Sequence, residues 1–293
     1  MLQHVIDVLA DPVDGTPLEL VDDGHRITAA SGHSYDVARQ GYVTLVGGGG
    51  LKHEGDDVAM VAARETFLGQ GHFAPFVEAV SEHVNHALEQ SGVSEEQHPV
   101  IVEIGAGTGY YLAHALDDVA DARGVGIDIS VPAAKMLAKC HPRVGAVVAD
   151  AWQRLPIRDE SVDIVTVIFA PRNPAEFARV LKKDGQVVVL TAHPGHLDEL
   201  RAPLGIIGVA DGKVEHLLEK AEGYLERIGN DEEIEFPMEL DRDSIAAQIG
   251  MSPSARHIPA EVLAERIAAL PEKMTVTAKA RITRLRRSAP STD

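Results

Sequence analysis

Cysteine is nearly absent from this sequence, which has 293 residues and a single cysteine, Cys140. One cysteine excludes a disulfide within the chain and fits a reducing cytoplasm. Long hydrophobic runs are absent as well, because no apolar stretch approaches the ~20 residues of a membrane span. The N-terminal segment carries acids where a secretory signal carries bases. We therefore expect a cytoplasmic protein without membrane contact.

Positive charge is also scarce, with 27 Lys and Arg residues against 45 Asp and Glu residues and a net charge of -18. A uniformly acidic surface repels phosphate, so nucleic-acid binding requires a local basic patch. The segment from Lys279 to Arg287 carries five bases and no acids. Apolar and polar residues alternate around it, so it fits a terminal strand with solvated bases equally well.

A glycine-rich turn is the most informative feature of the chain. An apolar run ends at Val102 and leads into Glu103, and glycines then occupy every second position, at Gly105, Gly107 and Gly109. A helix-like pattern follows. This order predicts a strand, a tight turn and a helix start, because a Cβ would block both the turn and the approach of a ligand to the backbone.

Strand-like and helix-like segments alternate after this point, which predicts an α/β fold with a mostly parallel, doubly wound sheet. The expected strands are 100–104, 124–129, 146–149, 164–169 and 186–191. Further along we expect a helix over 197–223, a solvated turn at 231–235, helices at 244–249 and 260–270, and a closing strand at 274–285.

The region before residue 99 has a different character. Residues 1–45 resemble a small β-rich module, because prolines and glycines punctuate short apolar segments. Residues 46–98 form a predicted helical linker region, with helices at 56–68 and 75–90. Residues 99–293 then form the main domain.

Two cofactors compete for the glycine turn, a dinucleotide and S-adenosylmethionine. The dinucleotide fingerprint requires a third glycine at position 110, where this chain has Tyr110. Glu103 would repel a pyrophosphate, whereas it attracts the ammonium group of a methionine moiety. The residues at this turn therefore favour S-adenosylmethionine.

Acidic residues at the ends of the next two strands support the same choice. Asp128, followed by Ile129, can accept both hydroxyls of an adenosine ribose, although a dinucleotide also has that ribose. Asp150, followed by Ala151, can accept the exocyclic amine of adenine, with apolar residues against the ring. The ordered set of one glycine turn and three strand-end acids is more specific than any member alone.

These motifs resemble class I S-adenosylmethionine-dependent methyltransferases over about residues 99–195. The chain as a whole is similar to the RlmA family of 23S rRNA guanine-N1 methyltransferases, some of which confer macrolide resistance. The segments that carry this closer resemblance are GHSYDVARQGYVTL (32–45), AARETFLGQGHFAPF (62–76), EIGAGTGYY (103–111), GIDIS (126–130), IFAPRNPAEFARVLKKDGQVVVLTAHPGHLDELR (168–201) and MSPSARH (251–257).

The resemblance implies a Rossmann-like class I methyltransferase with a mostly parallel seven-stranded sheet and a small N-terminal module. It also implies S-adenosylmethionine as cofactor, ribosomal RNA as partner and a homodimer. Family members hold zinc in the N-terminal module, but the matching positions here are Asp11, Asp14, Ala29 and His33. Two carboxylates, one imidazole and one methyl group do not make the closed thiolate-rich set that zinc prefers, so we expect no zinc.

The resemblance also assigns individual residues to the cofactor. Gly109 and Tyr110 match residues of the cofactor turn, and Phe73 and His196 match an aromatic residue and a histidine placed near the cofactor. The complete expected cofactor set is Phe73, Glu103, Gly105, Gly107, Gly109, Tyr110, Asp128, Ile129, Asp150, Ala151 and His196.

No residue of the sequence identifies itself as the catalytic base that guanine N1 would need. Phe169 follows the fourth strand, where acceptors usually lie in this fold, and its ring can stack on a base. Candidate phosphate ligands are Arg39, Arg64, Arg154 and Arg172. Two other functions stay open: a small-molecule C- or O-methyltransferase, which the acidity and the missing zinc ligands favour, and a non-catalytic cofactor-binding protein.

Overall fold

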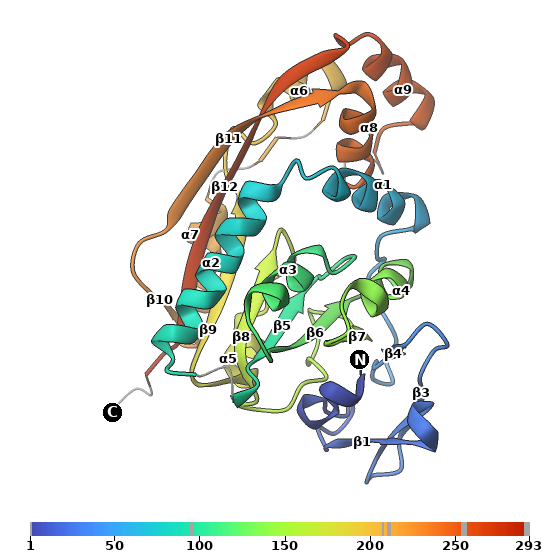
Figure 1. Cartoon of the computed structure of the whole chain (residues 1–293), viewed down its shortest axis with the longest axis vertical. Helices are drawn as coiled ribbons and strands as arrows, with labels where there is room; N and C mark the ends of the chain where they lie inside the picture. The colour runs from blue at the N-terminus through green and yellow to red at the C-terminus, as the bar shows by residue number, and fades with distance from the viewer. Residues whose placement is uncertain (1, 94–96, 207, 210–211, 253–256, 290–293) are drawn as a thin grey trace.

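The computed structural model describes residues 2–93, 97–206, 208–209, 212–252 and 257–289. Within these residues the chain forms one large sheet covered by helices and one small antiparallel sheet near the N-terminus (Figure 1). From edge to edge, the large sheet runs β10 (Leu225–Arg227), β12 (Lys273–Arg287), β9 (Leu181–Ala192), β8 (Val162–Ile168), β5 (Val100–Ile104), β6 (Arg123–Asp128), β7 (Val144–Val148) and β4 (Tyr42–Thr44), with β11 (Glu232–Asp241) paired to β12.

The six strands from β9 to β4 are parallel, which confirms the doubly wound α/β fold. The sheet has nine strands in the described residues, however, and not the expected seven. Two of its strands, β4 and β10, are only three residues long. Segments this short carry too little hydrophobic periodicity to be recognised in a sequence.

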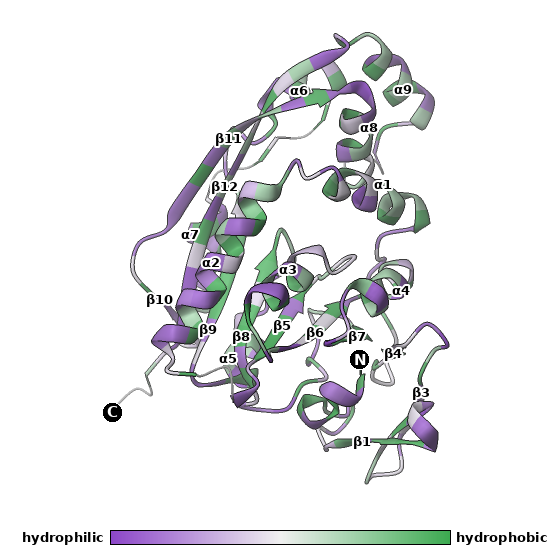
Figure 2. Ribbon diagram, viewed as in Figure 1, coloured by the Kyte–Doolittle hydropathy of each residue, from purple (hydrophilic) through white to green (hydrophobic). Residues whose placement is uncertain are grey.

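The central strands are apolar because helices cover both of their faces. Every residue of β5, β7 and β8 is buried. Figure 2 shows hydrophobic residues concentrated in these strands and hydrophilic residues along β11. Since β5, β6 and β7 are parallel neighbours, their carboxyl ends meet at one edge of the sheet, which brings Glu103, Asp128 and Asp150 to the same side.

Helices pack on the two faces of the sheet and around the arm that β11 and β12 form (Figure 1). One face shares a core with α2 (Ala74–Gln90), α3 (Tyr110–Asp118) and α4 (Val131–Cys140), and the other with α5 (Pro174–Val180) and α7 (Lys213–Ala221). Beyond the end of the sheet, α1 (Val58–Gly69) packs on α8 (Arg242–Gly250), near α6 (Asp198–Leu204) and α9 (Ala260–Ala268). In the described residues no helix combines the length and apolarity that a bilayer-crossing segment needs.

Two expectations for the C-terminal third are wrong. The helix over 197–223 is two helices, α6 and α7, because Gly205 ends α6 in the left-handed conformation with φ of 67°. The acidic segment 231–235 is not a solvated turn, since residues from Glu232 onward belong to β11. Only from Glu233 onward do its acids alternate with apolar residues, and Glu233 and Glu235 pair with bases of the neighbouring strand.

The bases of the neighbouring strand, β12, belong to the segment from Lys279 to Arg287, which the sequence suggests as a basic patch. Lys279 Nζ lies 2.9 Å from a Glu235 carboxylate oxygen, and Arg281 Nη2 lies 2.7 Å from Glu233. Arg286 pairs with Glu226 and Arg287 with Glu160. The interpretation as a terminal strand is therefore right, and acids of the same chain neutralise most of the segment.

The N-terminal module packs against the large sheet and does not stand apart from it. Three short 3-10 turns (η1 Leu2–His4, η2 Ile6–Val8, η3 Asp22–Gly24) accompany its three strands, β1 (Leu18–Val21), β2 (Arg26–Ala29) and β3 (Ser34–Asp36). Val5, Leu9 and Ile27 share one core with Val125 and Val147 of the large sheet. The last strand of the predicted module, β4, is itself an edge strand of that sheet.

Candidate active site

A cavity of about 690 Å³ lies at the carboxyl ends of the parallel strands. It brings together eight of the eleven residues that the sequence assigns to the cofactor: Phe73, Gly105, Gly107, Asp128, Ile129, Asp150, Ala151 and His196. Glu103 and Tyr110 line a smaller adjoining cavity of about 50 Å³. Gly109 lines neither of these cavities.

The glycine turn is tight because its neighbours leave no room for side chains. Gly105 has φ of 67°, and a Cβ there would lie 2.6 Å from the Cβ of Ala170. Gly107 has φ of 55° and donates its N–H to Asp128 Oδ2 at 2.8 Å. At Gly109 the φ is 82° and a Cβ would lie 2.5 Å from Cys140 Sγ, so this glycine lets α3 pack on α4.

Asp128 ties the end of β6 to the two segments beside it. Its Oδ2 accepts from Gly107, and its Oδ1 accepts the N–H of Ser130 at 2.8 Å. Burial raises the pKa of Asp128, and the two backbone hydrogen bonds oppose that shift. Each carboxylate oxygen retains a lone pair, so the group can still accept hydrogen bonds from a diol.

Asp150 is buried and held in its ionised form. Burial acts to raise its pKa, but hydrogen bonds from the Trp152 N–H, His53 and Gln153 outweigh burial and lower it. Trp152 N lies 3.0 Å from Oδ1, while His53 Nδ1 and Gln153 Nε2 lie 3.0 and 3.2 Å from Oδ2. The carboxylate therefore organises the loop after β7.

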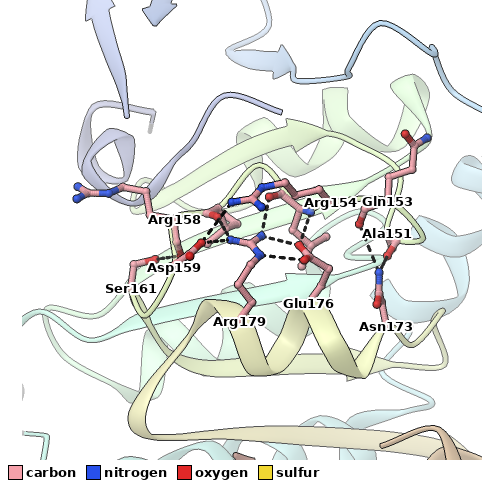
Figure 3. A network of polar contacts seen from close by, with 11 residues as sticks. Ala151, Gln153, Arg154, Arg158, Asp159, Ser161, Asn173, Glu176 and Arg179 are labelled. Carbon is pink, nitrogen blue, oxygen red and sulfur yellow. Dashed lines mark hydrogen bonds and ion pairs between the residues drawn. The ribbon is translucent and has the colours of Figure 1, made fainter. Parts of the chain in front are cut away.

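A polar network on α5 fixes the same loop from below (Figure 3). Asn173 Nδ2 donates to the carbonyl of Ala151 at 3.1 Å, and Glu176 Oε2 accepts the N–H of Leu155 at 2.8 Å. Arg179 holds Glu176 in place and also donates to the carbonyl of Leu155. The wall that carries Ala151 is thus rigidly attached to the body of the protein.

Four residues that line the small cavity have a buried polar atom without a hydrogen-bond partner: Glu103 Oε2, Arg64 Nε, Thr108 Oγ1 and Tyr111 Oη. Burial raises the pKa of Glu103 to about 8. Arg64 comes from α1, pairs with Asp56 at 2.5 Å and reaches the carbonyl of Met251 at 3.3 Å. These unsatisfied groups, one acid, one guanidinium and two hydroxyls, indicate a polar ligand, and the acid and the guanidinium suit an ammonium and a carboxylate.

An aromatic cluster forms the other end of the main cavity. Phe169 follows β8 with φ of 51°, a left-handed conformation that is strained for a phenylalanine, and its side chain is 41% exposed. Its ring stacks on His196 at a centroid distance of 6.1 Å and lies 6.3 Å from Phe73. Leu197, next to His196, also has a left-handed φ of 57°.

His196 is neutral and its tautomer is fixed. Burial lowers the pKa of its imidazole to about 4, with a further contribution from the charge of Lys213. Its Nδ1 accepts the N–H of Lys279 at 3.0 Å, so the proton of the neutral ring resides on Nε2. The side chain therefore offers a hydrogen-bond donor at the cavity and cannot use Nδ1 as a base.

Several residues that line the main cavity are not predicted from the sequence. His53, Glu54 and Asp56 come from the segment before α1, which approaches so closely that a Cβ on Gly55 would lie 2.6 Å from Ser130 Cα. Gln248 belongs to α8, and Met251, Ser252 and His257 belong to the MSPSARH motif, whose residues 253–256 lie outside the described residues. Apart from that motif, no residue pattern marks these segments as part of a site.

The positions that match zinc ligands also converge. One ligand atom from each of Asp11, Asp14 and His33 lies within 4.8 Å of the others, but Ala29 supplies no donor atom. The buried Asp11 carboxylate already accepts the N–H of Val13 at 2.7 Å. Its other oxygen accepts from Tyr35 Oη at 3.0 Å and lies 3.1 Å from His33 Nδ1. These residues do not fit a closed, four-ligand zinc site.

Comparison with known proteins agrees with this geometry. Residues 102–189 match a family model described as a methyltransferase domain. The chain is 40% identical over 284 residues to the "Putative 23S rRNA (guanine-N(1)-)-methyltransferase" of Micromonospora griseorubida, covering 94% of this chain and 96% of that one. It is 37% identical over 277 residues to the "23S rRNA (guanine(748)-N(1))-methyltransferase" of Streptomyces fradiae, with the same two coverages.

A solved complex of the Haloferax volcanii Trm112 methyltransferase activator with a methyltransferase has a TM-score of 0.46 and 20% identity, and covers 81% of this chain and 100% of that one. That likeness is too low to add to the assignment. The two sequence relatives each match 94% of this chain. The chain therefore belongs to the family of 23S rRNA (guanine-N1)-methyltransferases, which are class I enzymes dependent on S-adenosylmethionine.

Proposed function

We propose that this protein transfers a methyl group from S-adenosylmethionine to N1 of a guanine in 23S rRNA. The observation that carries the proposal is the division of the main cavity into two chemically different ends. The acids among its described lining residues are Glu54, Asp56, Asp128 and Asp150, and they gather where β6 and β7 end. The other end of the cavity, which the segments after β8 and β9 form, carries aromatic and basic side chains such as Phe169, His196 and Lys213.

The acidic end suits the donor, which is a cation. Asp128 is placed to accept the ribose hydroxyls, and Asp150 with Ala151 and Ile129 to hold the adenine. Glu103 Oε2 and Arg64 Nε, which are buried without partners, suit the ammonium and carboxylate of the methionine part. His196 offers Nε2–H as a donor to a cofactor acceptor atom.

The bound cofactor supplies an activated methyl group on sulfur, so the chain mainly has to align the two reactants. Guanine N1 carries a proton that must leave. His196 is held as a donor, and the acids of the described cavity lining lie at the opposite end, so we assign no general base. Phe169 stays the proposed wall on which the guanine stacks.

The direct test is methylation of deproteinised 23S rRNA by the purified protein, read by mass spectrometry of nucleosides. We expect 1-methylguanosine to appear only when both S-adenosylmethionine and RNA are present. A primer-extension stop at one guanine should also vanish from ribosomal RNA of a strain that lacks the gene. A stop that persists without the gene, or a methylated small molecule in place of RNA, would exclude this function.

The same assay tests the stacking wall. Replacing Phe169 with Ala should lower kcat/KM for RNA by roughly 5- to 150-fold, because base–aromatic stacking contributes ~1–3 kcal/mol. Affinity for S-adenosylmethionine should change little. The matched control is Tyr224→Ala, which removes an exposed aromatic ring outside the cavity. Equal kcat/KM for the two variants would remove the role given to Phe169.

Replacing Glu103 with Gln separates stability from binding. The ordinary pKa of this carboxyl is 4.5, and burial raises it to about 8 in the folded protein. Between these two pH values the carboxyl is therefore protonated in the folded wild type but ionised in the unfolded chain. Its contribution to stability is complete below 4.5 and is lost as pH rises through 8. Glutamine cannot ionise, so the cofactor-free variant should have the higher Tm at about pH 9, with the difference shrinking toward pH 5.

The same variant should bind S-adenosylmethionine roughly 10- to 100-fold more weakly, because the ammonium would face a neutral amide in place of a carboxylate. Calorimetry should also show that the wild type releases a proton on binding near pH 7 and that the variant does not. Unchanged affinity together with unchanged proton release would contradict the pairing of Glu103 with the ammonium.

We further propose that the N-terminal module folds without zinc, with the Asp11 carboxylate as its centre. Excess chelator should change neither Tm nor methyl transfer, and elemental analysis should find no stoichiometric zinc. Asp11→Ala should lower stability by about 1–3 kcal/mol or more, because buried donors lose their acceptor, whereas Glu19→Ala, an exposed acid of the same module, should be neutral. One equivalent of bound zinc would disprove this proposal.

A further inference from the structure

Two cations at the acceptor end of the cavity have no carboxylate partner among the described residues. Arg172 lies three positions after Phe169, and Lys213 begins α7 and lines the cavity. Arg172 Nη2 donates to the neutral hydroxyl of Thr191 at 3.0 Å. Its Nε is buried and has no hydrogen-bond partner. The guanidinium is therefore partly buried with most of its donors unused.

Both cations lie at the end of β9, because Arg172 bonds Thr191 in that strand and Lys213 lines the cavity together with the last residue of β9, Ala192. Burial lowers the pKa of Lys213, and the charge of Arg172 lowers it further. Burial also lowers the pKa of Arg172. Lys213 in turn acts on the imidazole of His196, which stacks on Phe169. Arg172 and Lys213 thus place positive charge without a described acidic partner at the end of the cavity that holds Phe169 and His196.

Several other basic residues that could hold RNA are paired with acids. Arg64 is paired with Asp56 and Arg154 with Asp159. Arg201, which also lines the cavity, is paired with Asp198 at 3.0 Å. Four of the five bases in the β12 segment are paired with acids of β10 and β11 or with Glu160, and Arg284 donates to Gln90. In a chain with a net charge of -18, free cations beside the cavity are a specific feature.

A half-buried guanidinium without an anion is costly, and an unpartnered buried donor such as Arg172 Nε calls for an explanation. A phosphate group meets this need well, because its oxygens accept two parallel hydrogen bonds from a guanidinium and attract an ammonium. An RNA strand carries such a group next to every base. The sugar-phosphate neighbour of a guanine stacked on Phe169 would lie at this end of the cavity.

We propose that Arg172 and Lys213 bind a phosphodiester of the RNA strand adjacent to the target guanine. The inference rests on the proposed function and adds to it the means by which an acidic protein holds RNA at its active site. It also predicts that single-stranded RNA around the target is gripped at its backbone, while the base itself enters the cavity.

The test compares the wild type with Arg172→Gln, Lys213→Gln and Arg172→Lys. The matched control is Lys183→Gln, which removes an exposed charge at the opposite end of β9. Binding of deproteinised 23S rRNA is measured at several potassium chloride concentrations, and binding of S-adenosylmethionine by calorimetry. Thermal unfolding verifies that each variant is folded. If Arg172→Gln is not folded, Arg172→Lys replaces it in the comparison, because lysine keeps the charge but lacks the planar guanidinium.

We expect Arg172→Gln and Lys213→Gln to weaken RNA binding roughly tenfold or more and to lower the salt slope by about one. Arg172→Lys should lose affinity while keeping the slope. Affinity for S-adenosylmethionine and the behaviour of Lys183→Gln should match the wild type. RNA affinity and salt slope equal to those of the wild type in both glutamine variants would overturn the proposal.

Two further outcomes are distinguishable. If the wild type neither binds nor methylates 23S rRNA, the proposed function fails, and this inference fails with it. In the other outcome the wild type methylates RNA, and Arg172→Gln weakens binding of guanosine monophosphate but does not weaken binding of RNA. The two cations would then bind a small phosphorylated ligand. That second result would overturn the RNA phosphodiester while leaving the proposed function intact.

Discussion

The hydrogen bond between the Gly107 N–H and the Asp128 carboxylate is the constraint on which the site depends. It joins the turn after β5 to the end of β6, and a second bond from Ser130 joins the same carboxylate to the start of α4. The glycine turn can approach only because no Cβ stands between it and the chain after β8. One side chain thus sets the spacing of the segments that surround the donor.

Charge is distributed along the cavity in a way that suits two different ligands. Carboxylates gather at the ends of β5, β6 and β7, where a sulfonium cofactor with an ammonium group belongs. Aromatic and cationic side chains gather after β8 and β9, where a nucleotide belongs. An acidic protein can therefore act on RNA, because the attraction is local and the acids of β10 and β11 neutralise bases elsewhere. The strained backbone of Phe169 and Leu197 occurs at this second end.

The sequence predicts most of the parallel sheet, because strands buried on both faces appear as continuous apolar runs bounded by turns. It also predicts which acids meet, since strand ends of parallel neighbours converge. It fails at β11, where acids alternate with Ile234 and Phe236 and the charge obscures a period of two. It fails at His53 and Glu54 as well, because their places depend on how α1 and its preceding segment pack on the finished sheet.

The most direct measurement of the central claim is a calorimetric titration with S-adenosylmethionine and, separately, with NAD. The wild type and Asp118→Ala, an exposed acid on α3, should bind S-adenosylmethionine equally, and Asp128→Ala should bind it at least roughly tenfold more weakly. None of the three should bind NAD. Binding of NAD in place of S-adenosylmethionine, or full affinity in Asp128→Ala, would contradict the account.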